Sequence, residues 1–305
     1  MKFIIREILK GQLLIKKDES IECVNLDDKS LIIEKIESIF EYEEKKQLVI
    51  LARGTKKKIL TDRLVNKINS NDSLYDGIFL VGEKAKNYLH KRIDIEHLIK
   101  AISNYDSSVA EWIFDEYSLF NLKNIDIKYF KNPLNKSSFI SKVKNIEELI
   151  NYYLFGLHTL NSGLLLNFVS STKNYSTALD CNNDLIIFFW LPANYKKFSV
   201  SKETLVKLKP KIKKLKLPEL YDSIKPSEEE YSIKGFILPH YIIGVYDVLG
   251  KSFILNPKIL EFKENWIADG FDIDYMTFLE FICSTKYERF LTLIDNSILI
   301  EKNVC

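Results

Sequence analysis

Two glutamates, Glu228 and Glu230, stand where a polar, acidic loop runs into an apolar, strand-like segment. Carboxylates at the rim of a sheet are held by the sheet backbone, so their positions can be fixed as closely as catalysis requires. Such a pair can accept a proton and stabilise a developing positive charge. The competing interpretation is a solvated turn, because three consecutive glutamates follow Pro226 and Ser227. The neighbouring segments favour the first interpretation.

Three further segments accompany the glutamates, two after them and one upstream. Residues 231–239 read Tyr-Ser-Ile-Lys-Gly-Phe-Ile-Leu-Pro, residues 242–245 read Ile-Ile-Gly-Val, and residues 168–172, upstream, read Phe-Val-Ser-Ser-Thr. Together they resemble the closing half of cholera- and pertussis-type mono-ADP-ribosyltransferases, which carry a Ser-Thr-Ser-like strand, a Glu-x-Glu pair, a Gly-Ile-Pro-type turn and an Ile-x-Gly-like strand. The chain departs from that pattern by one extra residue, Leu238.

The resemblance implies a reaction in which NAD loses nicotinamide through an oxocarbenium-like state. Glu230 is expected to accept a hydrogen bond from the ribose hydroxyl and to stabilise the cation. Ser170, on a neighbouring strand, is expected to donate to Glu230 and hold its rotamer. Glu228 is expected to activate the incoming nucleophile, because alternate residues of an extended chain share a face.

The resemblance also implies an arginine that binds the NAD pyrophosphate, and the planar guanidinium suits phosphate oxygens. Arg53 is the candidate, because it follows the compact apolar segment 47–52, and Gly54 permits a sharp exit from that strand. Arg6 and His158 are the alternatives. Ser171 and Thr172 are expected to contribute to NAD binding as well.

A lysine-rich segment and a proline-bounded loop precede the glutamates. Nine lysines occur between residues 196 and 216, and residues 206–217 alternate basic with apolar side chains. This segment is either the solvated face of a helix or strand, or a stripe that tracks phosphates. Tyr221, in the loop, is the residue that the resemblance implies for contact with the acceptor. The Glu pair favours protein arginine as the acceptor, whereas the lysine-rich segment favours RNA or DNA.

Length and composition indicate a globular chain. It has 305 residues, 46% hydrophobic, and a formal net charge of +2, which does not by itself indicate a polyanionic partner. Four cysteines show no metal-ligand or disulfide-framework spacing, so no metal is expected. The N-terminus has no apolar run typical of a signal peptide, and no segment is long enough to span a membrane. We therefore expect a cytoplasmic protein, or one that is delivered into a target cell.

The fold class predicted is α+β, an ADP-ribosyltransferase-like split, largely antiparallel sheet with an N-terminal helical elaboration. Residues 1–150 are expected to hold the first core strand and a helical insertion, and residues 151–305 the catalytic core. The function implied is that of a mono-ADP-ribosyltransferase toxin or effector that uses NAD as co-substrate and is opposed by an antitoxin or immunity protein. The alternative is a non-catalytic binding or defence module that contacts nucleic acid or a partner protein through its lysines.

Overall fold

The computed structural model of the chain divides into two compact units. The described residues are 1–17, 20–57, 75, 78–79, 138, 141–143, 146, 148–149, 152–153, 155, 168–180, 183–193, 199–217, 229–234, 237, 241–262 and 267. Unit 1 comprises residues 1–89, 174–195 and 237–305, and unit 2 comprises residues 90–173 and 196–236. The units interleave along the chain. The helical insertion that the sequence predicts after the first core strand lies mostly outside the described residues.

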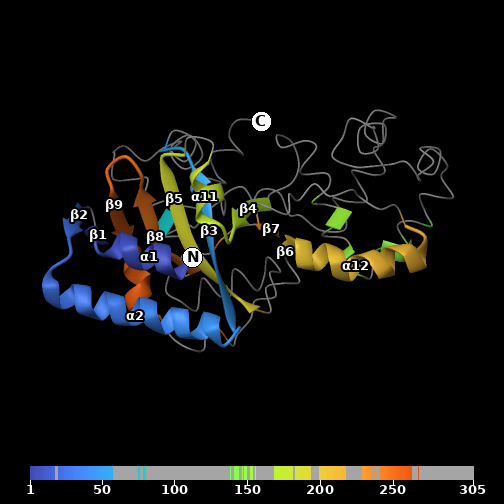
Figure 1. Ribbon diagram of the computed structural model, residues 1–305, viewed down its shortest axis with the longest axis horizontal. Helices are drawn as coiled ribbons and strands as arrows, with labels where there is room; N and C mark the ends of the chain where they lie inside the picture. The colour runs from blue at the N-terminus through green and yellow to red at the C-terminus, as the bar shows by residue number, and fades with distance from the viewer. Residues whose placement is uncertain are drawn as a thin grey trace, which may run out of the picture. The chain divides into compact units, whose positions relative to one another are not determined.

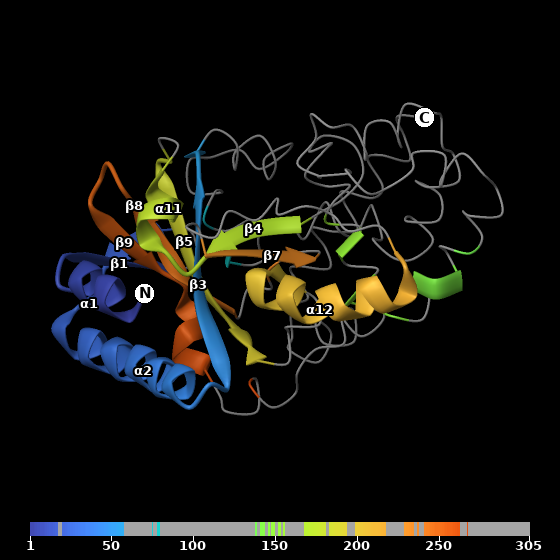
Figure 2. The same cartoon turned by 45° about the vertical axis from the view of Figure 1, so that its right-hand side comes forward.

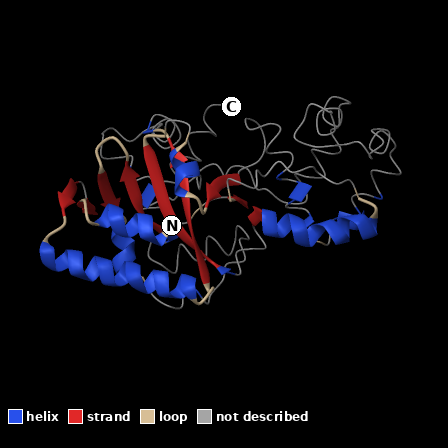
Figure 3. Cartoon of the chain, viewed as in Figure 1, coloured by secondary structure: helices blue, strands red, loops and turns tan. Residues whose placement is uncertain are grey.

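Unit 1 is built on a mixed sheet (Figures 1 and 3). Its described strands, in chain order, are β1 (Gln12–Lys17), β2 (Ser20–Cys23), β3 (Leu48–Thr55), β5 (Leu185–Pro192), β8 (Ile242–Asp247) and β9 (Ser252–Leu255). In space they follow the order β2-β1-β9-β8-β5-β3. The β1–β9 pair is parallel and the other pairs are antiparallel, so the α+β class is confirmed.

Strand β5 is the centre of this sheet because all eight of its residues are buried. A continuous apolar run of this kind is typical of a strand covered on both faces. It pairs with β3 on one side and β8 on the other. The indole of Trp190 meets the rings of Tyr241 and Phe262 edge to face, at centroid distances of 4.7 and 5.4 Å. The strand that the sequence predicts at 47–52 is confirmed as part of β3.

Two helices, α1 (Lys2–Leu9) and α2 (Leu26–Glu44), lie along the same side of this sheet (Figures 1 and 2). Each contributes apolar residues to the core at helical spacing, Ile5 and Leu9 from α1 and Ile32, Ile36, Ile39 and Phe40 from α2. Helix α2 begins at Leu26 and includes the acidic segment 34–44. Asn25 caps it by accepting a hydrogen bond from the Asp28 amide at 2.7 Å.

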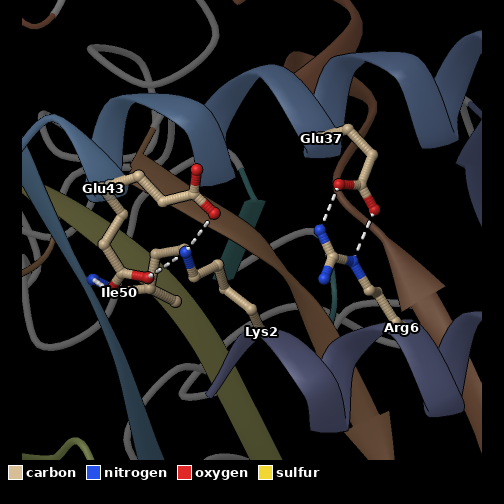
Figure 4. Close-up of polar contacts among 6 residues, drawn as sticks. Lys2, Arg6, Glu37, Glu43 and Ile50 are labelled. Carbon is tan, nitrogen blue, oxygen red and sulfur yellow. Dashed lines mark hydrogen bonds and ion pairs between the residues drawn. The ribbon is translucent and has the colours of Figure 1, made fainter.

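Ion pairs join the two helices (Figure 4). The guanidinium of Arg6 donates from Nε and Nη2 to the two carboxylate oxygens of Glu37, at 2.8 and 2.6 Å, and lies 5.2 Å from the centre of the Phe40 ring. Lys2 donates to Glu44 at 2.9 Å and lies 3.9 Å from the Glu43 carboxylate. The guanidinium nitrogens that Arg6 uses in this ion pair are those that a bidentate contact to a phosphate would use.

Two glycines allow elements of unit 1 to approach closely. A Cβ on Gly54 would collide with the carbonyl oxygen of Ala178, in the short helix α11 (Tyr175–Leu179), and with the side chain of Asn183. The role predicted for Gly54, a sharp exit from the strand, is wrong, because β3 continues through Gly54 to Thr55. A Cβ on Gly244 would lie 2.6 Å from the Phe253 ring, so glycine there lets the ring lie against β8.

Unit 2 contains a small antiparallel ribbon and a long helix. Its described strands are β4 (Phe168–Thr172), β6 (Ser199–Ser201) and β7 (Glu230–Lys234), with β7 between the other two. Helix α12 (Lys202–Leu215) follows β6 directly, and Ser201 caps it through the Thr204 amide. Leu205, Leu208 and Ile212 are its buried residues. The helix ends at Lys216, whose left-handed φ of 52° closes the last turn, and Lys142 donates to the Leu215 carbonyl at 3.0 Å.

Candidate functional site

The register between β4 and β7 determines which predicted site residues share a face. Thr172 pairs with Glu230 and Ser170 pairs with Ser232. Residues directly opposite each other in an antiparallel pair project to the same face, as do residues two apart along a strand. Ser170, Thr172, Glu230 and Ser232 therefore form one hydroxyl- and carboxylate-bearing face of the ribbon, which we call the Glu230 face.

The carboxylate of Glu230 is oriented by a residue of its own strand. The hydroxyl of Ser232 donates to Glu230 Oε1 at 2.9 Å. Ser232 is fully buried and Glu230 is half-buried. Sequence reasoning assigned the orienting hydroxyl to Ser170 and missed Ser232. The signal was present in Glu-Tyr-Ser, because residues two apart in a strand share a face.

Ser170 lies exposed on the Glu230 face, opposite Ser232. The structure thus brings together on one ribbon the two residues that the sequence placed on neighbouring strands. A hydrogen bond from Ser170 to Glu230 remains a prediction.

Ser171 lies on the other face of the ribbon, opposite Tyr231. It is buried, and its hydroxyl donates to the carbonyl oxygen of Tyr231 at 2.6 Å. This hydrogen bond joins β4 to β7, so the Ser171 hydroxyl has a structural role. Thr172 is buried directly opposite Glu230. The NAD-binding roles predicted for Ser171 and Thr172 remain predictions.

The Tyr231 face also carries a cation. Lys173 Nζ lies 4.9 Å from the centre of the Tyr231 ring, and the Lys173 amide donates to the Glu229 carbonyl at 3.3 Å. Burial lowers the pKa of Lys173, but the hydrogen bond and charge interaction with Tyr231, together with Glu203 and Glu229, outweigh burial and leave that pKa raised. Lys173 is therefore a charged lysine at the end of β4.

Strand β7 begins at Glu230 rather than at Glu228. Glu229 has a left-handed φ of 46°, a conformation that interrupts extended backbone. Because the chain is not extended at Glu229, alternation along a strand does not carry over to Glu228, and its role as the base remains a prediction. Glu228 itself, Tyr221 and His158 lie outside the described residues.

The two candidate arginines both lie in unit 1. Arg53 is half-exposed near the end of β3, where it pairs with Ile187. Its role as the pyrophosphate ligand remains a prediction. Arg6 is paired in bidentate fashion with Glu37, and this ion pair between α1 and α2 accounts for the residue structurally.

The chain is thus an α+β protein with a mixed sheet, and unit 2 carries a carboxylate held by a buried hydroxyl. Comparison with known proteins finds no matching family model, curated protein or solved structure. Within the described part of the chain, no three His, Cys, Asp or Glu side chains gather as metal ligands. A search of the same residues also finds no helix with the length and apolar character needed to cross a membrane.

Proposed function

We propose that the chain is a mono-ADP-ribosyltransferase that takes ADP-ribose from NAD and passes it to a macromolecular acceptor. The observation that supports this proposal is the Glu230 face, on which Ser232 orients the carboxylate at 2.9 Å and Ser170 lies exposed opposite Ser232. A carboxylate that serves as an electrostatic catalyst must be held in place before charge develops. A glutamate in a solvated turn has no need of a buried hydroxyl partner.

In the proposed reaction the bond between the ribose anomeric carbon and nicotinamide breaks, and nicotinamide leaves with the electron pair. Glu230 stabilises the positive charge that develops on the ribose and accepts a hydrogen bond from its hydroxyl. The acceptor's nucleophilic atom then bonds to the anomeric carbon and releases a proton, for which Glu228 is the proposed base. Of these groups, Glu230 is the one that the observed hydrogen bond supports.

The test is NAD cleavage by the purified full-length chain, with release of labelled nicotinamide as the readout. Glu230→Gln keeps the size of the side chain and removes its charge, so we expect it to abolish cleavage. Glu229→Gln is the matched control, because Glu229 is the exposed neighbour that precedes the strand. We expect the control to retain activity. Near-normal turnover by Glu230→Gln, or equal loss in both variants, would defeat the assignment.

The acceptor class is tested with the same preparation. The chain is incubated with NAD labelled in the adenylate and with whole-cell lysate, followed by protease or nuclease digestion. Label removed by protease alone identifies a protein acceptor, and label removed by nuclease alone identifies a nucleic acid. Expression toxicity that Glu230→Ala relieves would support the toxin interpretation and the expectation of an antidote partner.

A further inference from the structure

Helix α12 carries an unusual density of positive charge. Between Lys202 and Lys216 it has seven lysines, all exposed, and one acidic residue, Glu203. The lysines are Lys202, Lys207, Lys209, Lys211, Lys213, Lys214 and Lys216. Like charges three or four residues apart destabilise a helix by about 0.2–0.5 kcal/mol per pair. In a helix whose lysines face only solvent, nothing offsets this repulsion, whereas a bound polyanion would. The arrangement therefore points to a polyanionic partner.

The helical repeat sorts the lysines of the helix body into two rows. At 3.6 residues per turn, Lys202, Lys209 and Lys213 fall on one side of the exposed surface. Lys207, Lys211 and Lys214 fall on the other side. Between the rows runs a ridge formed by Glu203, in the first turn, and then by Val206 and Pro210. It lies opposite the buried Leu205, Leu208 and Ile212, and Val206 is 60% exposed.

We propose that α12 binds double-stranded DNA, with the ridge directed into the major groove and one lysine row toward each phosphate backbone. The major groove of B-DNA is about 12 Å wide and admits an α-helix, whose diameter with side chains is about 10–12 Å. Two rows of cations on either side of a ridge whose one charged residue, Glu203, lies in the first turn of the helix match two lines of phosphates on either side of a groove. A single strand offers one line of phosphates, and the major groove of A-form RNA is too narrow for such an insertion.

The position of α12 relates this surface to the Glu230 face. The helix begins at Ser201, which ends β6 and pairs with Tyr231, the residue after Glu230. DNA bound along α12 is therefore held by the same ribbon that carries the candidate carboxylate. Binding itself does not depend on the proposed reaction, and the two are measured separately.

The test is fluorescence polarisation of a labelled 20-base-pair DNA duplex with the full-length chain, from 50 to 200 mM NaCl. Six lysine–phosphate contacts give a slope of about −5 in log K against log salt, a loss of roughly 10³-fold over this range. Replacing one row, Lys207→Gln, Lys211→Gln and Lys214→Gln, should reduce the magnitude of the slope by about 3, since each lysine contributes about 1. The control replaces three exposed lysines of unit 1, Lys10, Lys46 and Lys251, with glutamine, removes the same charge, and should leave the slope unchanged.

A second variant tests the groove geometry rather than the charge. Val206→Glu places a second acid on the ridge, one turn beyond Glu203, and the exposure of Val206 lets the helix tolerate it, as circular dichroism will show. We expect at least a tenfold loss of duplex affinity, more than for Glu at the control site Leu249, which is 79% exposed in unit 1. Equal loss in row and control variants, equal or tighter binding of single-stranded DNA or duplex RNA, or binding only to anionic vesicles would overturn the proposal.

Discussion

The hydrogen bond from Ser232 to Glu230 can be tested by removing its donor. Ser232 is fully buried and its Oγ lies 2.9 Å from Glu230 Oε1, so Ser232→Ala leaves a space too small for a water molecule to replace the hydroxyl. A hydrogen bond to a charged group contributes about 1.5–3 kcal/mol. Because Glu230 is half-buried and water can reach part of its carboxylate, we take the lower end, about 1.5 kcal/mol.

This free energy corresponds to roughly a tenfold loss of kcat for NAD cleavage, since 1.4 kcal/mol is a factor of about ten. The matched control is Ser171→Ala, which removes a buried hydroxyl from the same ribbon, one that donates to the Tyr231 carbonyl on the opposite face. We expect the control to lower stability by about 1 kcal/mol and to leave kcat within about twofold.

A double-mutant cycle measures the bond without reference to activity. Urea unfolding of Glu230→Ala, Ser232→Ala and the double variant should give a coupling free energy of about 1–1.5 kcal/mol, whereas Ser171→Ala and Glu230→Ala should be additive within about 0.5 kcal/mol. Additivity of Ser232→Ala with Glu230→Ala, or equal losses of kcat in the two serine variants, would refute the claim that Ser232 orients Glu230.

Three further predictions concern the stability of the fold. Gly54→Ala should destabilise unit 1 by about 1–3 kcal/mol, because its Cβ meets the backbone of Ala178, and the change is read from the midpoint of thermal unfolding. Asp247 accepts hydrogen bonds from the Gly250 amide at 2.9 Å and from Lys57 Nζ at 2.6 Å. Burial raises the pKa of the Asp247 carboxyl, but these contacts outweigh burial and hold that pKa below its ordinary value. The contacts therefore stabilise the fold above the ordinary pKa of an aspartate, and this stabilisation is lost as the pH falls through the pKa of Asp247 in the folded chain. Asp247→Asn should be less stable than the parent at pH 7, and urea titrations should show the difference vanish at low pH. Lys216→Gly should raise stability by about 0.5–1 kcal/mol, because glycine adopts φ 52° without the penalty of a side chain; a lower unfolding midpoint would contradict this.

The strands of the central sheet could be predicted because their signal is local. Strand β5 is a run of eight apolar residues rich in aromatic and β-branched side chains, and this length and composition favour a buried strand over a helix. Helix α12 could not be decided in the same way. Its apolar residues Val206, Leu208 and Ile212 alternate with lysines as in a strand. The structure instead buries Leu205, Leu208 and Ile212 at helical spacing and exposes Val206, an outcome that the Ser201 cap favours.

The arginine assignments depended on contacts that sequence does not show. Arg6 follows an apolar stretch, as a strand-end arginine does, yet Phe3 is 69% exposed and Ile5 and Leu9 are buried, which is the pattern of a helix. The partner of Arg6, Glu37, lies 31 residues away in the chain. Nothing in the spacing of the two residues predicts an ion pair over that separation, because it arises only when α1 and α2 pack on the same face of the sheet.

The orientation of Glu230 has a consequence for how the two proposals combine. Since Ser232 is two residues along the same strand, the hydrogen bond needs only the extended backbone of β7, whereas a bond from Ser170 would also need the pairing with β4. The carboxylate is therefore set by its own strand, and the same strand pairs with β6, from which α12 begins. Strand β7 would thus position both the ribose, through Glu230, and the DNA duplex, through its pairing with β6. If the chain cleaves NAD and binds duplex DNA, DNA becomes the favoured acceptor; if it binds DNA without cleaving NAD, unit 2 is a DNA-binding module in which Ser232 stabilises β7.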